Sequence, residues 1–378
     1  MSELPDRSHP VFAVIAGGGT GGHAVPAVAI ARALVERGHA PSTIHFVGSA
    51  RGIERRLVPE AGFSITLLPG RGIARRLTPD NIGAVAGLMS AAIQAFFLLR
   101  RLRPSVVITV GGYASAPCAA AAVILRIPLI VEEQNATPGL ANRLAGRFAL
   151  ACAVSFPGTP LPRSVVTGNP VRQEIISVNR SPEGRAAAKK ALGLPADRTV
   201  VAVAGGSLGA RRINDATLGL AALWADRGDV AIRHVIGERD FEQVTSASPV
   251  PAATGLVYQQ IRFEDRMDLL LAAADVTVQR AGASTVSELA VAGVPSILVP
   301  LPGAPGDHQT LNARMLADAG AAVLVPDSEL DGERLARELD RLIGDPGLLD
   351  SMAAAAGGLG RPDAASKVAA LAEEHARA

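Results

Sequence analysis

The residues best suited to grip a nucleotide stand in one short segment, residues 279–288, which reads Gln-Arg-Ala-Gly-Ala-Ser-Thr-Val-Ser-Glu. We expect Val276, Val278 and the alanine-rich run before them to form a strand. We then expect a tight turn at Gly282, and Ser284 or Thr285 to begin a helix whose unpaired amides attract anions. Glu288 would lie one turn into that helix, where its carboxylate could accept both hydroxyls of a ribose. Thr285 and Glu288 also have capping-box spacing, and on this segment alone that purely structural role is favoured.

A run of glycines at residues 17–23, Gly-Gly-Gly-Thr-Gly-Gly-His, follows the apolar residues 11–16 and precedes a predicted helix. This order is typical of a nucleotide-binding fold, and the spacing matches the dinucleotide fingerprint. We reject an NAD site, because the second strand ends in Gly48 and Ser49, where the ribose-binding acid should stand. His23 lies on the first helical turn, which favours a neutral imidazole able to act as a base, although histidine there is often only a cap or packing residue.

Further polar or glycine-rich loops follow other predicted strands: Gly111-Gly112-Tyr113-Ala114-Ser115, Glu132-Glu133-Gln134-Asn135 and Gly205-Gly206-Ser207-Leu208-Gly209-Ala210. Ligands of open α/β sheets collect at the carboxyl ends of strands. Ser207 could be only an N-cap, or its hydroxyl and the neighbouring amides could hold a phosphate. His308 and Gln309 are of the kind that read sugar hydroxyls, although polar loop residues are usually just solvated.

The elements needed to position these loops occur twice. At 378 residues the chain exceeds what one core usually organises, and 48% apolar, 19% charged and 3% aromatic residues indicate a well-packed α/β protein. The alternation of strands and helices restarts at residues 199–204, and we place the domain boundary near residues 168–172. We therefore expect two Rossmann-like α/β domains that face each other across a cleft.

Composition excludes several other classes of protein. The net charge of +2 excludes a broad nucleic-acid-binding surface. Cys118 and Cys152 lack metal-ligand spacing and are expected to be small buried hydrophobes in a reducing compartment. The first ten residues lack the apolar region of a signal peptide, and the longest apolar stretches fall short of the roughly 20 residues of a membrane span. We expect a soluble cytoplasmic protein, or at most a peripheral one.

Arginines bracket one apolar stretch. Arg71, Arg75, Arg76, Arg100, Arg101 and Arg103 flank a segment in which apolar residues recur at helical spacing, at Ile82, Val85, Met89, Ile93 and Phe96. A stripe of this kind usually packs against a sheet, and the pattern favours burial. An apolar patch ringed by basic residues could also rest on an anionic membrane surface, and one helix could do both with different faces.

Seven motifs occur in order along nearly the whole chain: Gly-Gly-Thr-Gly-Gly-His (18–23), Gly-Gly-Tyr-Ala-Ser (111–115), Glu-Gln-Asn (133–135), Gly-Asn-Pro-Val-Arg (168–172), Gly-Gly-Ser-Leu-Gly-Ala (205–210), Arg-Ala-Gly-Ala-Ser-Thr-Val-Ser-Glu (280–288) and His-Gln-x-x-Asn-Ala (308–313). Together they resemble the MurG family, the UDP-N-acetylglucosamine (UDP-GlcNAc) transferases that convert lipid I to lipid II in peptidoglycan synthesis. The resemblance implies a GT-B fold. It also implies an acceptor- and membrane-facing domain at residues 10–168, joined by the last helix at about 360–378, and a UDP-GlcNAc-binding domain at residues 169–359.

By this resemblance, Glu288 would bind the ribose, Ser207 and the turn near Ser284 the pyrophosphate, and His308 with Gln309 the sugar. The full donor set is Thr20, Gly21, Gly22, Asn135, Arg172, Ser207, Ala283, Ser284, Thr285, Glu288, His308 and Gln309. The acceptor lipid I, undecaprenyl-pyrophosphoryl-MurNAc-pentapeptide, would meet Gly111, Gly112, Tyr113 and Ser115. Two residues depart from the family pattern: Glu132 stands where many relatives have His, and Glu264 where an apolar residue usually touches the uracil.

The implied reaction displaces UDP from the anomeric carbon, with inversion, by the C4 hydroxyl of the muramoyl sugar. His23 is the first candidate for the base that takes the proton, and Glu132 or Glu133 the second. Helix N-termini near Ser207 and Thr285 could stabilise the leaving pyrophosphate. The sequence has no Asp-x-Asp triplet, and we expect neither a metal nor a cofactor. The acceptor's lipid tail would keep the enzyme on the anionic inner-membrane surface, at the cytoplasmic face of the bacterial cell membrane.

Two other classes share many of these features. Another UDP-sugar enzyme of the same fold, such as a lipid glycosyltransferase or a UDP-GlcNAc 2-epimerase, would share the donor motifs and differ in the acceptor half. A catalytically silent membrane scaffold would share even more. Transfer to a different acceptor would identify the first class, and donor binding without turnover would identify the second.

Overall fold

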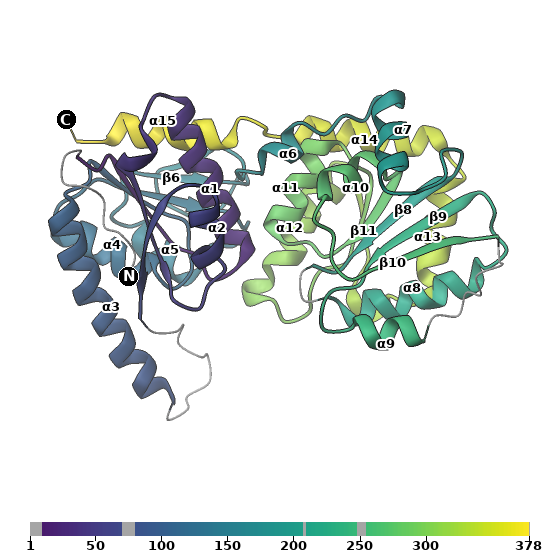
Figure 1. The fold of residues 1–378 in the computed structure, drawn as a ribbon, viewed down its shortest axis with the longest axis horizontal. Coiled ribbons are helices and arrows are strands. Elements are labelled where there is room, and N and C mark those ends of the chain that lie inside the picture. Colours follow the sequence, from purple (N-terminus) through teal and green to yellow (C-terminus); the bar gives the residue numbers. More distant parts are fainter. Residues whose placement is uncertain (1–9, 70–79, 207–208, 248–254, 378) are drawn as a thin grey trace. The chain divides into compact units, whose positions relative to one another are not determined.

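The computed structural model describes residues 10–69, 80–206, 209–247 and 255–377. The chain divides into two compact units (Figure 1). Unit 1 comprises Met1–Arg172 and Arg361–Ala378, and unit 2 comprises Gln173–Gly360. The division falls four residues after the boundary drawn from sequence at residue 168, and the last helix belongs to unit 1.

Unit 1 has a parallel sheet in the order β3-β2-β1-β4-β5-β6-β7. Its strands are β1 (Ala13–Ala16), β2 (Ile44–Ser49), β3 (Ser64–Leu68), β4 (Val106–Thr109), β5 (Leu129–Glu133), β6 (Ala151–Val154) and β7 (Ser164–Val166). Its helices are α1 (Gly21–Glu36), α2 (Glu54–Glu60), α3 (Asp80–Leu102), α4 (Ser115–Ile124), α5 (Leu140–Ala145) and α15 (Ala364–His375), with a 3₁₀ turn η1 (Pro41–Thr43).

Successive strand residues of unit 1 face opposite layers of helices. Val14 and Val107 pack in the core that α3 and α4 cover, whereas Ile15 and Ile108 pack against α1 and α15. Strands buried on both faces are near-continuous apolar runs, which is the pattern that β1 and β4 show in the sequence. Helix α15 is fastened at its end by an ion pair in which Arg37 Nε lies 2.9 Å from the Glu373 carboxylate.

Unit 2 repeats this architecture with the strand order β10-β9-β8-β11-β12-β13. Its strands are β8 (Thr199–Ala204), β9 (Val230–Val235), β10 (Val257–Ile261), β11 (Val276–Gln279), β12 (Ser296–Leu298) and β13 (Ala322–Leu324). Its helices are α6 (Gln173–Ile176), α7 (Pro182–Ala191), α8 (Arg211–Leu223), α9 (Phe241–Ser246), α10 (Met267–Ala273), α11 (Ala283–Ala292), α12 (His308–Ala317), α13 (Gly332–Ile343) and α14 (Pro346–Leu359), with 3₁₀ turns η2 (Pro305–Asp307) and η3 (Asp327–Glu329).

In both sheets the strand order reverses beside the first strand, between β1 and β4 in unit 1 and between β8 and β11 in unit 2. Loops that leave neighbouring strands on opposite sides of such a point open a crevice, and ligands of doubly wound folds bind there. Each of the four glycine-containing loops singled out from the sequence follows one of these four strands. The topology therefore places the predicted binding loops at the two crevices.

The favoured interpretation of the apolar stripe on α3 is wrong at two positions. Met89 and Ile93 are exposed, at 64% and 58%, and Phe97 beside them at 62%. Among the α3 side chains that the structure describes, the fully buried ones are Ala91, Ala95 and Leu99. Phe96 is half-buried against this core, and Ile82, Val85 and the arginines before residue 80 lie outside the side chains that the structure describes. Met89, Ile93 and Phe97 thus form an outer stripe, and the alanines on the other face let α3 pack closely on α4.

The prediction that both cysteines are buried is confirmed. Cys118 and Cys152 are free thiols in the core of unit 1. Burial raises the pKa of Cys118 to about 12 and that of Cys152 to about 11. Both side chains therefore remain neutral thiols at pH 7 and serve as small apolar groups.

Two buried histidines should make stability depend on pH. Burial lowers the pKa of His45 to about 4 and that of His234, held between Tyr258 and Asn214, to about 3. Below pH 6.5 these histidines bind protons in the unfolded chain but stay neutral in the folded chain. Folding stability therefore falls as pH falls from 6.5 toward their folded pKa values. At pH 5 the loss is about 2 kcal/mol for each histidine. Urea unfolding at pH 7.5 and 5.0 should show a smaller drop for His234→Gln than for the wild type, and an equal drop would contradict this account.

Candidate functional site

The loops after β1 and β4 touch through their backbones. The Gly18 amide donates to the Gly111 carbonyl over 3.2 Å. Gly17, Gly18, Gly111 and Gly112 all have positive φ angles, and a Cβ atom on Gly112 would collide with the Gly18 carbonyl oxygen. Only glycine permits both the conformation and the approach. The result is a close-packed pair of loops in which Gly18 and Gly111 are buried and Gly17 and Gly112 are half-buried.

His23 lies over this pair of loops. Its Nδ1 is 3.1 Å from the Thr20 hydroxyl, and its Nε2 is 2.7 Å from the point where a Cβ of Gly111 would stand. Gly21 and Gly22 are the first residues of α1, so their amides belong to the unsatisfied helix end. The structure thus brings together four predicted donor or catalytic residues and the first predicted acceptor residue.

Glu132 and Glu133 end β5 instead of following it, and both are buried. The Glu133 carboxylate accepts from the Asn135 amide at 2.9 Å, the Gly139 amide at 3.0 Å and Asn142 Nδ2 at 2.9 Å. Burial, and then the charge of Glu133, raise the pKa of Glu132 well above its usual range. This geometry gives Glu133 the work of shaping the loop that carries Asn135, and it disfavours both carboxyls as the base.

Two of the predicted acceptor residues also hold loops together. Ser115 is buried, and its hydroxyl lies 2.9 Å from the Ala16 carbonyl and 2.8 Å from that of Gly111. The Tyr113 hydroxyl donates to the Pro69 carbonyl over 2.9 Å, and burial raises its pKa. Both side chains are bonded within unit 1 and hold these loops together.

In segment 279–288 the helix begins earlier than the sequence predicts, and the turn before it is ordinary. Helix α11 begins at Ala283 with Gly282 as its N-cap, and Gly282 has an ordinary negative φ of −63°. Thr285 therefore lies inside the first turn and is not an N-cap, so the capping-box interpretation is wrong. The amides of Ala283, Ser284 and Thr285 form the open helix end, and Glu288 lies on the next turn, half-buried.

Three side chains clamp the turn that precedes α11. Gln309 Oε1 accepts from the Ala281 amide at 3.2 Å, and Asn312 Nδ2 donates to the Ala281 carbonyl over 3.2 Å. Arg280 is fixed by the Val299 and Pro300 carbonyls and by Asp327, 2.6 Å away. Sequence reasoning marked Gln309 as a sugar ligand and missed this role of Arg280 and Asn312. The clamp holds the start of α11 rigidly in place.

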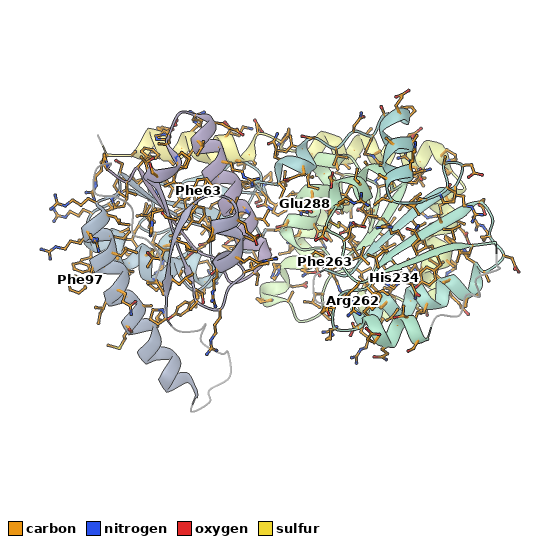
Figure 2. The ribbon with its side chains drawn as sticks, in the orientation of Figure 1. Phe63, Phe97, His234, Arg262, Phe263 and Glu288 are labelled. Atoms are coloured by element: carbon orange, nitrogen blue, oxygen red, sulfur yellow. The ribbon has the colours of Figure 1, made fainter. Side chains whose placement is uncertain are left out.

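One side chain at this helix end lacks a partner. The buried hydroxyl of Ser284 makes no hydrogen bond within the part of the chain that the structure describes. Glu288, labelled in Figure 2, follows it by four residues on the same helix. His308 is the first residue of α12 and its Nδ1 lies 2.8 Å from the Pro305 carbonyl. A buried polar group without a partner calls for an explanation, and a ligand at the start of α11 supplies one.

Glu264, which departs from the family pattern, is turned inward. Its carboxylate forms a buried ion pair with Arg233, whose Nη2 is 2.6 Å away, and accepts from the Arg266 amide at 3.1 Å. The neighbouring Phe263 is 56% exposed beyond the carboxyl end of β10. The apolar surface at this position is thus presented by Phe263, a residue that sequence reasoning passed over, and the acid at Glu264 serves the fold.

Some predicted features cannot be placed. Ser207 lies outside the described residues. In the described ranges, no group of three His, Cys, Asp or Glu side chains could hold a metal ion. Over the same ranges, no helix is long and apolar enough to cross a membrane.

Known proteins resemble this chain over almost its whole length. Residues 13–154 match the glycosyltransferase family 28 N-terminal domain, and residues 200–369 match the family 28 C-terminal domain. The UDP-N-acetylglucosamine--N-acetylmuramyl-(pentapeptide) pyrophosphoryl-undecaprenol N-acetylglucosamine transferase of Acidothermus cellulolyticus is 41% identical, covering 97% of this chain and 98% of the relative. The protein of the same name from Alkalilimnicola ehrlichii is 42% identical, covering 96% and 99%.

Solved structures agree. The crystal structure of Acinetobacter baumannii MurG matches with a TM-score of 0.75 and 30% identity, covering 96% of this chain and 99% of that one. The UDP-GlcNAc 2-epimerase from Neisseria meningitidis, solved with UDP-GlcNAc bound, has a TM-score of 0.67 at 13% identity and covers 96% and 100%. The second likeness shows the fold alone.

Proposed function

Because the chain belongs to the MurG family of UDP-GlcNAc transferases, we propose that it moves GlcNAc from UDP-GlcNAc to lipid I, with the crevice of unit 2 binding the donor and the crevice of unit 1 binding the acceptor. The protein is a GT-B glycosyltransferase, and its reaction yields lipid II. The observation that carries the function is the identity of about 40% with curated transferases across both family domains. Formation of a disaccharide lipid from UDP-GlcNAc and a lipid I analogue, followed by mass spectrometry, tests it.

The donor binds at the start of α11. The amides of Ala283, Ser284 and Thr285 face the pyrophosphate, and the unpartnered Ser284 hydroxyl donates to the same group. Glu288, one turn in, accepts the ribose hydroxyls. Developing negative charge on the departing UDP is stabilised by these fixed dipoles, which need no reorganisation because the clamp on Ala281 holds them in place.

The acceptor binds against the backbone of Gly111 and Gly112, and His23 takes the proton of the attacking hydroxyl. His23 is half-buried on a helix N-terminus, with its Nε2 side toward Gly111. Neither Glu132, which is buried and bonded to Gln134, nor Glu133, bonded to several donors, is as well placed. Attack from the face opposite the departing UDP inverts the anomeric carbon. Thr20, Asn135 and Arg172 in unit 1, and Ser207, His308 and Gln309 in unit 2, are the remaining donor contacts that we propose.

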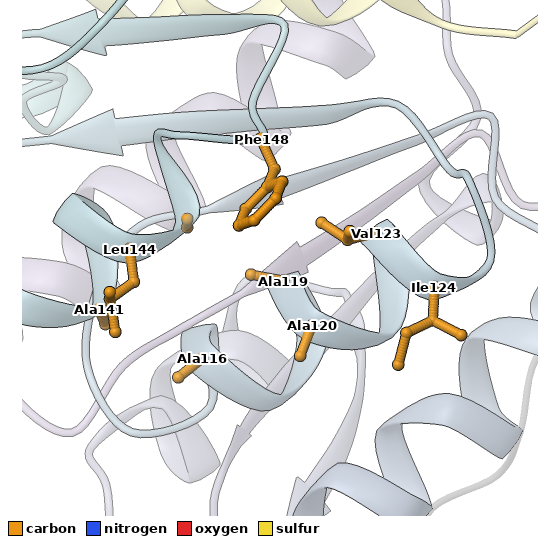
Figure 3. A pocket seen from close by; sticks show the side chains of 9 residues that line it. Ala116, Ala119, Ala120, Val123, Ile124, Ala141, Leu144 and Phe148 are labelled. Carbon is orange, nitrogen blue, oxygen red and sulfur yellow. The ribbon is translucent and has the colours of Figure 1, made fainter.

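We further propose that unit 1 rests on an anionic membrane through α3, α4 and α5. Met89, Ile93 and Phe97 form the exposed stripe of α3, and Phe97 projects away from the sheet (Figure 2). On the neighbouring helices an apolar hollow of about 360 Å³ opens between α4 and α5 (Figure 3). Its wall includes the exposed Ile124, Leu144 and Phe148. Exposed arginines lie on α3 at Arg100 and Arg101, on α5 at Arg143, and in the turn after α5 at Arg147. Apolar anchors beside basic residues suit the surface of an anionic bilayer.

The double substitution Ile93→Asp/Phe97→Asp should weaken binding to vesicles containing anionic lipid by at least about tenfold, because two apolar side chains no longer enter the bilayer. Turnover of a short-chain, water-soluble acceptor should stay unchanged. Leu223→Asp, at an equally exposed leucine on α8 of unit 2, is the matched control. Vesicle co-sedimentation measures the effect, and retained binding by the double variant would remove α3 from the membrane surface.

A further inference from the structure

A buried carboxylate lies directly beneath the first glycine loop. Glu54, the first residue of α2, is only 2% exposed. Its Oε2 accepts from the Gly19 amide at 2.7 Å and its Oε1 accepts from the Ser49 amide at 2.7 Å. Backbone amides bound by a carboxylate make short, charge-assisted hydrogen bonds. The side chain thus ties the end of β2 to the loop that carries Thr20 and His23.

The sequence around Glu54 leaves room for it. Cβ atoms added at Gly18, Gly48 or Gly52 would each collide with atoms of the Glu54 side chain. Three glycines, one from the loop after β1 and two from residues 48–52, therefore enclose one carboxylate. Gly18 and Gly19 also have φ angles of 132° and 100°, which glycine adopts readily, and in this conformation the Gly19 amide points at the carboxylate.

This arrangement limits which ligand groups the first glycine loop can bind. In a dinucleotide fold the amides of the first glycine loop face the ligand's pyrophosphate. Here the Gly19 amide is already taken by a carboxylate, which would also repel a phosphate placed at that point. The parts of the loop left for substrate are Thr20, the start of α1 and His23.

We infer that Glu54 is a positioning residue for the transfer reaction. By fixing Gly19 it sets the place of Thr20 and, through the contact of Thr20 with His23, the place of the proposed base over Gly111. The role rests on the proposed function of the loop, and it requires a carboxylate, because only two acceptor oxygens satisfy both amides. A glutamine has the same shape but turns an NH₂ group toward one of the two donors.

Glu54→Gln should lower kcat for transfer to a lipid I analogue by about 100-fold, since a small misplacement of a catalytic group has an effect of that size. The KM for UDP-GlcNAc should change much less than kcat, because the ribose and pyrophosphate contacts lie on α11 in unit 2 and only the proposed contact with Thr20 is displaced. Val58→Ala, a buried change on the same helix, controls for lost stability and should keep its kcat at temperatures where it is folded. Glu60→Gln, exposed on α2, controls for the charge.

Hydrogen exchange supplies a readout that is independent of turnover. Peptides covering Gly19 and Ser49 should exchange faster in Glu54→Gln than in the wild type, whereas Val58→Ala should not show this local increase. Unchanged exchange and kcat in Glu54→Gln, or an equal loss of kcat in Val58→Ala, would overturn the inference. If the wild type itself fails to transfer GlcNAc, the proposed function falls, while the exchange comparison still decides whether Glu54 holds the loop.

Discussion

Replacement of His23 by alanine is expected to lower kcat by about 10²–10⁴-fold, because the attacking hydroxyl loses the group that takes its proton. The KM for UDP-GlcNAc should move little, since the ribose and pyrophosphate contacts lie on α11. Steady-state kinetics with saturating donor and a short-chain lipid I analogue measures this. The base must be unprotonated to act, so kcat/KM of the wild type should rise with pH along an acid limb that His23→Ala lacks.

Two further variants make this result specific. Thr20→Val removes the hydroxyl beside His23 Nδ1 and should have a smaller effect on kcat than loss of the ring itself. Glu133→Gln should chiefly disturb the loop that carries Asn135, and with it the KM of the donor. Retention of kcat within about threefold by His23→Ala, together with a large kcat loss in Glu133→Gln, would move the base to the carboxylate.

Glu288→Gln is expected to raise the KM for UDP-GlcNAc by about 10- to 100-fold, because hydrogen bonds between a carboxylate and the ribose hydroxyls are each worth about 1.5–3 kcal/mol. The kcat at saturating donor should fall less. A 2′-deoxyribose donor should bind the wild type more weakly and should distinguish less between wild type and variant, because only the contact with the 3′-hydroxyl remains. Titration calorimetry with UDP and initial rates with both donors measure these effects.

Glu333→Gln, at an exposed glutamate on α13, is the matched control and should leave donor binding unchanged. Equal loss of affinity for the ribose and 2′-deoxyribose donors in Glu288→Gln would contradict contact with the 2′-hydroxyl. Glu288 is only half-buried, so we expect the variant to fold, and thermal melting checks this.

The architecture of both units was largely predictable, because short local sequence patterns indicate most of its strands and helices. Strands buried on both faces appear as short apolar runs, and Thr199–Ala204 has the bounds that were expected. The loops that follow β1, β4, β8 and β11 were predictable for the same reason, since glycine marks the positions where two backbones must meet. The alanine-rich residues 272–274 misled, because they end helix α10 and do not begin strand β11.

Side-chain roles were less predictable where they depend on partners far along the chain. Met89 and Ile93 are exposed because small residues form the buried face of α3. A search for large apolar residues at helical spacing gives alanines little weight and therefore selects the wrong face. Glu54 meets an amide 35 residues away, and no spacing in the sequence reveals that. Glu264 departed from the family pattern for a reason visible only in three dimensions, its ion pair with Arg233.

The measurement that tests the central claim most directly is UDP release from UDP-GlcNAc with and without a short-chain lipid I analogue, with UDP-GalNAc as an alternative donor and EDTA in one arm. We expect release that requires the analogue, prefers UDP-GlcNAc and survives EDTA. Release that is indifferent to the analogue would point to another acceptor or to epimerase chemistry. Donor binding without any release would contradict the transferase account and favour a silent scaffold.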